Sequence, residues 1–139
     1  MIEEMAAEPA KTFEDLEAWK AARELRVFVF RRVVPELRQH REFDLMDQIK
    51  RASRSVGNNI AEGYGRFHFR DNYRFCSNAR GSLAETLDHL ITCNDDDLIS
   101  AELLAEGREL FEQALKVLNG YMLWLKRSAD PAGHSRDPN

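Results

Sequence analysis

The sequence has few of the residues that interrupt helices and few that form disulfides. Its 139 residues include 7 Gly, 4 Pro and 2 Cys. Cys76 and Cys93 lack CxxC spacing and nearby histidines, so neither a redox pair nor a metal site is expected, and both are interpreted as small buried thiols. Leu, Ala, Glu and Arg dominate instead, which is typical of a soluble helical protein.

Long apolar runs are also missing. No stretch approaches the roughly 20 apolar residues that are needed to cross a bilayer. The N-terminal MIEEMAAEPAK carries acids where a signal peptide has a basic region followed by an apolar core. We therefore expect a cytoplasmic protein without a membrane partner, and a chain of this length without a change in composition predicts a single domain.

A catalytic centre is not expected either. The histidines have no partner at helical spacing, and no Ser, Cys or Lys has neighbours that suggest activation. His89, beside Asp88 and Glu85, is interpreted as part of a solvated pair. The chain contains no Glu-x-x-His, which di-iron bundles require. The sequence thus predicts no enzyme, no metal and no cofactor.

Apolar residues at steps of three and four predict four amphipathic helices. Pro35 is expected to end or kink the first of them. Gly63 and Gly65 are expected to close the second in the left-handed conformation that glycine adopts readily. The expected helices run from Thr12 to Pro35, from Asp44 to Gly65, from about Phe69 to Asn94, and from Ser100 to Arg127.

Short links between these helices favour an antiparallel up-and-down four-helix bundle. Thr12 and Asp15 form a variant capping box, and Asp44 and Ser100 are the expected N-caps of the second and fourth helices. The two ends of the chain lack apolar periodicity and are expected to be disordered. The predicted organisation is a disordered segment 1–11, a bundle 12–127 and a disordered tail 128–139.

Charge is distributed unevenly along the chain. The net charge is −4, but the segment from Ile49 to Arg80 holds seven basic residues against two acids, a balance of +5 that leaves −9 for the rest. Such a segment favours contact with a polyanion or with an acidic protein surface. The alternative is that Arg and Lys stems cover apolar surface while their charged groups stay solvated.

Two lines of residues follow the outer side of the second helix at helical steps. The small residues of the second line would let another backbone approach, and an interface between subunits could pair Arg51 with a neighbour's acid. An ordinary solvated face explains the same pattern. One line holds Arg51, Ser55, Asn58 and Glu62, and the other holds Lys50, Arg54, Gly57 and Ala61.

The segment from Gly63 to Arg70 alternates aromatic and basic side chains. Single-stranded nucleic acid favours this combination, because bases stack on rings while cations meet phosphates. Aromatic rings are more often buried, so the alternative is that they plug one end of the bundle. The rings concerned are Tyr64, Phe67, Phe69 and Tyr73.

Three segments carry a resemblance to a known family. In chain order they are FEDLEAWKAA, QIKRASRSVGNNIAEGYGR and FCSNARGSLAETLDHL. Over Phe13 to Arg127 the chain resembles the four helix bundle protein family, also called intervening-sequence proteins, which was first read from insertions in large-subunit ribosomal RNA genes. The family is similar to an accessory protein of diversity-generating retroelements. This resemblance implies a homo-oligomer, most simply a barrel-like pentamer, with a role in binding nucleic acid.

The predicted function is therefore that of a non-catalytic, oligomeric bundle that binds RNA or DNA through its basic surface. The alternative is an oligomeric scaffold that binds another protein and no nucleic acid. The expected nucleic-acid-binding residues are Lys50, Arg51, Arg54, Arg66, Arg70 and Arg74. The residues that the resemblance marks as family motif or subunit interface are Gln48, Asn59, Glu62, Gly63, Arg80, Gly81 and Ser82.

Overall fold

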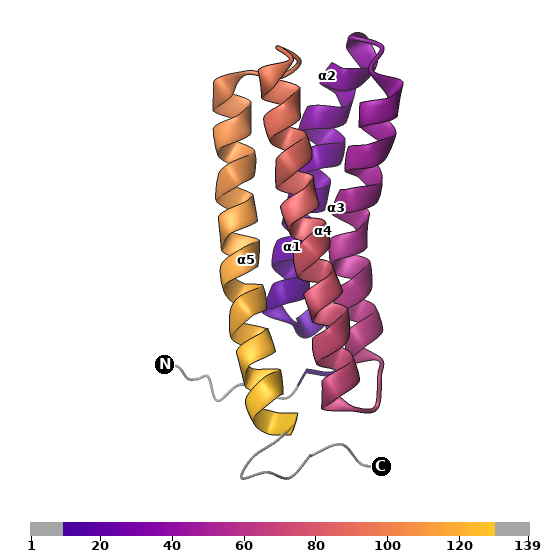
Figure 1. Cartoon of the computed structure of the whole chain (residues 1–139), viewed down its shortest axis with the longest axis vertical. Helices are drawn as coiled ribbons and strands as arrows, with labels where there is room; N and C mark the ends of the chain where they lie inside the picture. The colour runs from indigo at the N-terminus through magenta and orange to yellow at the C-terminus, as the bar shows by residue number, and fades with distance from the viewer. Residues whose placement is uncertain (1–9, 130–139) are drawn as a thin grey trace.

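The computed structural model describes residues 10–129, and every regular element in that range is helical (Figure 1). The elements are the 3-10 turn η1 (Phe13–Asp15), α1 (Glu17–Phe28), the π-helical turn η2 (Val29–Val33), α2 (Val34–Gln39), α3 (Phe43–Tyr64), α4 (Phe69–Asp95) and α5 (Ala101–Ala129). Since α1, η2 and α2 follow one another without a break, the chain forms four rods. Consecutive rods run in opposite directions, which confirms the predicted all-α four-helix bundle.

The bundle predicted over residues 12–127 lies within the described residues 10–129. Ser128 and Ala129 extend α5 two residues beyond the predicted end at Arg127. Most of the two predicted disordered segments lies outside the described residues. Between residues 10 and 129, none of the helices combines the length and the apolar character needed to cross a membrane.

Pro35 does not end the first rod. The helical path continues to Gln39, and the irregularity lies just before the proline, where the backbone N–H of Val34 bonds to the carbonyl of Val29 five residues earlier. In a regular helix the proline ring would clash with the carbonyl four residues back, and π-helical turns are one way in which helices absorb such a disturbance. The turn also leaves both Val29 and Val33 fully buried.

Two of the three predicted helix starts are confirmed. Thr12 and Asp15 form the capping box, although it caps η1 and α1 begins two residues after η1 ends. Ser100 Oγ accepts a backbone N–H of α5 at 3.0 Å. The third was wrong, because α3 begins after Glu42 and Asp44 lies in its first turn. In the first turn, its negative charge still interacts favourably with the positive end of the helix dipole.

The predicted left-handed closure of the second helix was also wrong. Gly63 lies inside α3, and Gly65 caps the helix in the right-handed region, with φ of −75°. A Cβ on Gly63 would lie 2.6 Å from Asn72 Oδ1 and 3.0 Å from the carbonyl oxygen of Asn72. Glycine is therefore needed at this position because α4 approaches closely, not because the chain turns there.

All four rods contribute apolar side chains to one core. The apolar stripe predicted for the second helix is buried, but on the first rod Leu25 and Val29 are fully buried, whereas Trp19 and Phe30, which were expected to face inward, are only partly buried. Large aliphatic residues from every rod lie in the middle of the bundle. The largest of them are Leu25, Leu37, Ile49, Ile60, Leu83, Leu90, Leu118 and Leu125. This core fixes the rotation of each rod about its axis and thereby decides which charged residues face outward.

Polar side chains also lie on the core-facing side of α4, which the apolar pattern of this helix did not predict. Asn72 Nδ2 donates to Tyr121 Oη at 2.9 Å, and Thr86 Oγ1 donates to a backbone carbonyl of the preceding turn at 2.9 Å. His89 is only 9% exposed and lies 3.3 Å from a carboxylate oxygen of Glu85, so the prediction of a solvated histidine was wrong. Each of these buried groups has a partner, as burial of polar atoms requires.

Cys76 and Cys93 are free and buried, which confirms their predicted character. Burial raises the pKa of the Cys76 thiol to about 12. The pKa of Cys93 also rises to about 12, first through burial and then through the negative charges of Asp96 and Glu42. The thiolate is the nucleophilic form, so both thiols are held in an unreactive state at neutral pH.

Candidate nucleic-acid interface

Lys50 and Arg54 lie against the first rod of the same chain. Lys50 Nζ is 5.7 Å from the centre of the Phe30 ring, and the guanidinium carbon of Arg54 is 4.7 Å from it, both within cation–π range. Beside them, a Cβ on Gly57 would lie 3.4 Å from Trp19 Nε1. Of the small residues expected to receive another subunit, Gly57 therefore lies against Trp19 of α1. A subunit interface over this flank stays a prediction.

Arg66 and Arg74 hold one aromatic ring between them. Their guanidinium carbons lie 4.7 Å and 4.9 Å from the centre of the Phe75 ring. Each also has an acidic partner in its own helical region, with Arg66 2.9 Å from Glu62 and Arg74 3.4 Å from Asp71. These exposed pairs are weak, but the two carboxylates reduce the local positive charge.

Arg70 and Arg51 lie on other parts of the surface. Arg70 lines a groove of about 280 Å³ with Tyr73 of α4 and with Lys126 and Ala129 of α5. Arg51 borders a polar groove of about 520 Å³ between α3 and α4, whose lining also includes Glu85 and Arg54. Of the six predicted cations, Lys50 and Arg54 share the Phe30 ring, Arg51 lines a groove with Arg54, Arg66 and Arg74 share the Phe75 ring, and Arg70 lies beside Lys126.

Several family-motif residues form hydrogen bonds between helices of the same chain. Ser55 Oγ and Ser82 Oγ are 2.8 Å apart across the contact of α3 with α4, and Asn59 Nδ2 donates to Ser55 Oγ at 3.0 Å. Arg80 donates to Asn119 Oδ1 of α5 at 2.8 Å. Short polar side chains at a helix contact let the backbones approach while their hydrogen bonds stay satisfied.

The remaining motif residues differ in their surroundings. Glu62 pairs with Arg66, and Gly63 is packed against α4 as described above. Gln48 lines the polar groove between α3 and α4. A Cβ on Gly81 would have no atom within 4 Å among the described residues, so this glycine leaves an open strip on the outside of α4. A subunit interface over this strip stays a prediction.

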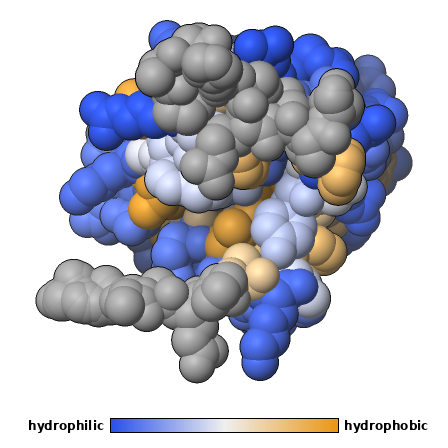
Figure 2. All heavy atoms as spheres, turned by 90° about the horizontal axis from the view of Figure 1, so that it is seen from below, coloured by the Kyte–Doolittle hydropathy of each residue, from blue (hydrophilic) through white to orange (hydrophobic). Residues whose placement is uncertain are grey.

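The aromatic residues at the α3–α4 junction are only partly a plug. Tyr64 is half-buried and donates to the carbonyl of Ala10 at 3.0 Å, and Phe69 packs against Trp124 with ring centres 5.7 Å apart. Phe67, by contrast, is 72% exposed. Figure 2 views this end of the bundle and shows apolar surface near its centre, surrounded by polar residues.

Two arginines that the sequence analysis missed lie beside Arg54. A groove of about 220 Å³ between α1 and α3 is lined by Arg23 and Arg26 together with Trp19, Arg54, Gly57 and Asn58. The missed residues belong to the first helix, far along the chain from the basic segment. The signal that could have found them is their helical spacing from Trp19, because steps of four and three place Trp19, Arg23 and Arg26 on one side of the first helix.

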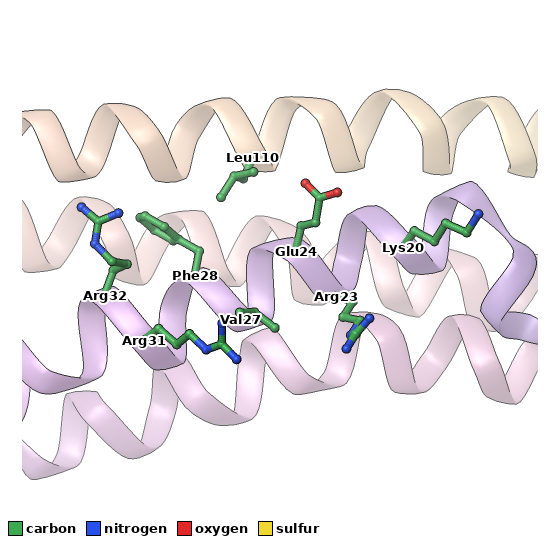
Figure 3. Close-up of a pocket in the computed structure, with 8 residues that line it drawn as sticks. All are labelled: Lys20, Arg23, Glu24, Val27, Phe28, Arg31, Arg32 and Leu110. Carbon is green, nitrogen blue, oxygen red and sulfur yellow. The ribbon is translucent and has the colours of Figure 1, made fainter.

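Another groove, of about 660 Å³, lies between α1 and α5 (Figure 3). Its apolar part consists of Val27, Phe28 and Leu110. Figure 3 shows Glu24 directed toward α5, whereas Arg23 and Arg31 turn away from Leu110. Arg23 thus lines both the α1–α5 groove and the α1–α3 groove, whereas Glu24 lines only the α1–α5 groove of these two.

Over residues 10–129 there is no group of three or more His, Cys, Asp or Glu side chains placed to hold a metal ion. The described geometry consists instead of cations, aromatic rings and amide groups on an outer helical surface, which is chemistry suited to binding.

A family model matches most of the bundle. The model of the family described as 23S rRNA-intervening sequence protein matches residues 14–120, which run from η1 through α1, η2, α2, α3 and α4 into α5. A search of curated proteins gives no match. Because the family model covers more than half of the chain, the protein belongs to the 23S rRNA-intervening sequence protein family.

Proposed function

We propose that this protein is a non-catalytic, oligomeric bundle that binds nucleic acid, RNA or DNA. One observation carries the proposal: Arg23, Arg26, Lys50 and Arg54 form a cationic surface across α1 and α3, in a chain whose net charge is −4. A local positive surface on an acidic protein attracts a polyanion without making the whole chain adhere to it. The Phe30 ring beneath Lys50 and Arg54 holds these two cations on this surface.

Binding to RNA is expected to weaken steeply with salt. Each phosphate that a cation neutralises releases counterions, so the logarithm of affinity falls linearly with the logarithm of salt concentration, with a slope of about −0.7 for each contact to a single strand. Fluorescence anisotropy of a short fluorescein-labelled oligouridylate, measured over a series of potassium chloride concentrations, gives this slope. The variant K50E/R54E is expected to lower affinity at least about tenfold.

A matched control keeps the total charge the same in this experiment. Arg108 and Lys116 are exposed on α5, and R108E/K116E changes the net charge by the same amount. The control is expected to bind oligouridylate much more tightly than K50E/R54E. Equal loss in both variants, or no binding by the parent protein at low salt, would contradict the proposed function.

Self-association is the second part of the proposal, and exposed apolar residues support it. Phe43, Phe67, Leu123 and Trp124 are large and exposed, and such groups are often covered in an assembly. Light scattering is expected to give a mass several times that of the 16.1 kDa chain, with five copies as the number that the family resemblance implies. The mass of a single chain, with and without oligouridylate, would contradict it.

The scaffold alternative predicts a different result in the same experiments. If K50E/R54E separates the subunits, the cations belong to an interface and the protein assembles through them. Lys50 and Arg54 are held over Phe30 within their own chain, which favours the nucleic-acid interpretation over this one.

A further inference from the structure

We propose that the groove between α1 and α3 is a phosphate-binding site, in which Arg23, Arg26 and Arg54 surround one phosphate group. The proposal deepens the proposed function and rests on it in one respect, since the phosphate that we expect is a backbone phosphate of nucleic acid. The same chemistry would also accept the phosphate of a small molecule, and the experiment below separates the two sources.

The lining of this groove offers donors and no carboxylate. Besides its three arginines, it contains the indole of Trp19, the side-chain amide of Asn58 and Gly57. Among residues 10–129, neither Arg23 nor Arg26 forms an ion pair, and neither Trp19 Nε1 nor the Asn58 side chain has a hydrogen-bond partner. A ligand whose oxygens only accept hydrogen bonds satisfies all of these groups at once.

The charge around the groove favours a compact anion. Glu24, the acid next to Arg23 in sequence, is directed toward α5 and lines the other groove (Figure 3), and Glu17 pairs with Lys20 at 3.2 Å. Three arginines line the groove and no acid does, so their charges repel one another and a bound anion would reduce that repulsion. Arginine forks also match the geometry of phosphate oxygens.

The size of the groove narrows the choice of ligand further. A space of about 220 Å³ admits a phosphate group with a few waters. It does not admit a helix of a partner protein, whose diameter with side chains is about 10 Å. An acidic peptide helix is therefore a poor occupant, whereas a phosphodiester can enter while the rest of its strand lies over the outer surface of α1 and α3.

The chain holds these groups in place before any ligand arrives. Arg54 lies over Phe30, and Trp19 is held by an edge contact with Phe13, with ring centres 5.1 Å apart. Gly57 lets the indole approach α3, since a Cβ there would already be 3.4 Å from Trp19 Nε1. Side chains that are fixed in this way lose little conformational freedom on binding.

Trp19 supplies a direct probe of the site. The chain has two tryptophans, so the variant W124F leaves Trp19 as the single reporter. In this background, sodium phosphate is titrated at constant ionic strength against sodium chloride, and the emission of Trp19 is recorded. A saturable change with phosphate that chloride does not produce is the expected result.

Two double variants test the assignment of residues. R23Q/R26Q removes two charges inside the groove, and R31Q/R108Q removes two outside it. The first is expected to abolish the phosphate response of Trp19 and to lower oligouridylate affinity about tenfold for each arginine lost, while the second keeps the response and loses less affinity. Light scattering checks that both keep the parent mass.

The outcomes separate this site from the proposed function. If oligouridylate binds but both double variants lose equal affinity and phosphate leaves Trp19 unchanged, the site is overturned and the function stands. If oligouridylate does not bind but phosphate changes Trp19 emission in an arginine-dependent way, the function fails and the site serves another phosphate compound. A change of mass in R23Q/R26Q alone would assign these arginines to a subunit interface and overturn the site.

Discussion

Replacing Gly63 with alanine is expected to lower the free energy of unfolding by about 2 to 3 kcal/mol, because the new Cβ has no space. It would lie 2.6 Å from Asn72 Oδ1, 3.0 Å from the Asn72 carbonyl oxygen and 3.0 Å from Phe75 Cβ. The last two atoms belong to the backbone or sit directly on it, so they cannot rotate away. Relief requires α4 to move from α3, which also strains the bond from Asn72 Nδ2 to Tyr121.

Gly81 provides the matched control, since it is also a helical glycine and a Cβ there meets no atom within 4 Å. Gly81→Ala is expected to leave stability unchanged or to raise it by up to about 1 kcal/mol, because alanine favours the helix. Urea unfolding followed by circular dichroism measures both variants. Equal changes in stability in the two variants would mean that Gly63→Ala alters only helix propensity. The close approach of α4 would then not be the reason that position 63 needs glycine.

The arrangement of the four rods was predictable because each rod carries a long apolar stripe with helical spacing. α3 shows this well: Ile49, Ala52, Val56 and Ile60 all lie in the core as their spacing predicts. The polar residues inside α4 were not predictable in this way. Asn72, Thr86 and His89 interrupt its stripe, and their burial depends on partners that only the folded chain brings near.

Local irregularities in the backbone were harder to predict for a similar reason. Pro35 signals a disturbance, but its form depends on how Val29 and Val33 pack, and here a π-helical turn keeps both buried. Gly63 and Gly65 invite the prediction of a turn, because glycine is the usual residue at a helix end. The tight contact of Gly63 with α4 involves residues nine and twelve positions away, Asn72 and Phe75, whose positions depend on the path of the chain between them.

Charge along the sequence predicted part of the candidate site, but it did not predict which cations lie together. The basic segment correctly placed Lys50 and Arg54 on the outside of α3, but it grouped them with Arg66 and Arg74, which have acidic partners on another part of the surface. It also left out Arg23, since that residue belongs to the first helix. The grouping depends on which rod packs against which, and therefore on the core.

Replacing Leu25 with alanine is expected to lower the free energy of unfolding by about 2 to 5 kcal/mol. Leu25 is fully buried and comes from α1, the helix that contributes Arg23 and Arg26 to the phosphate groove. Truncation removes apolar contacts and leaves a cavity that the surrounding rods fill only in part. Urea unfolding is expected to show a lower midpoint with an unchanged dependence on urea concentration.

Glu24 gives the control for this substitution, because it is the neighbouring residue of the same helix and its side chain is exposed. Glu24→Ala is expected to change stability by less than about 0.5 kcal/mol. Similar losses in both variants would mean that α1 is not anchored in the core through Leu25. The comparison also bears on the phosphate site: R23Q/R26Q alters only outward side chains and is expected to unfold at the same urea midpoint as the parent. A loss of phosphate binding in that variant then reflects the missing guanidinium groups, whereas a loss in Leu25→Ala reflects the displacement of the helix that carries them.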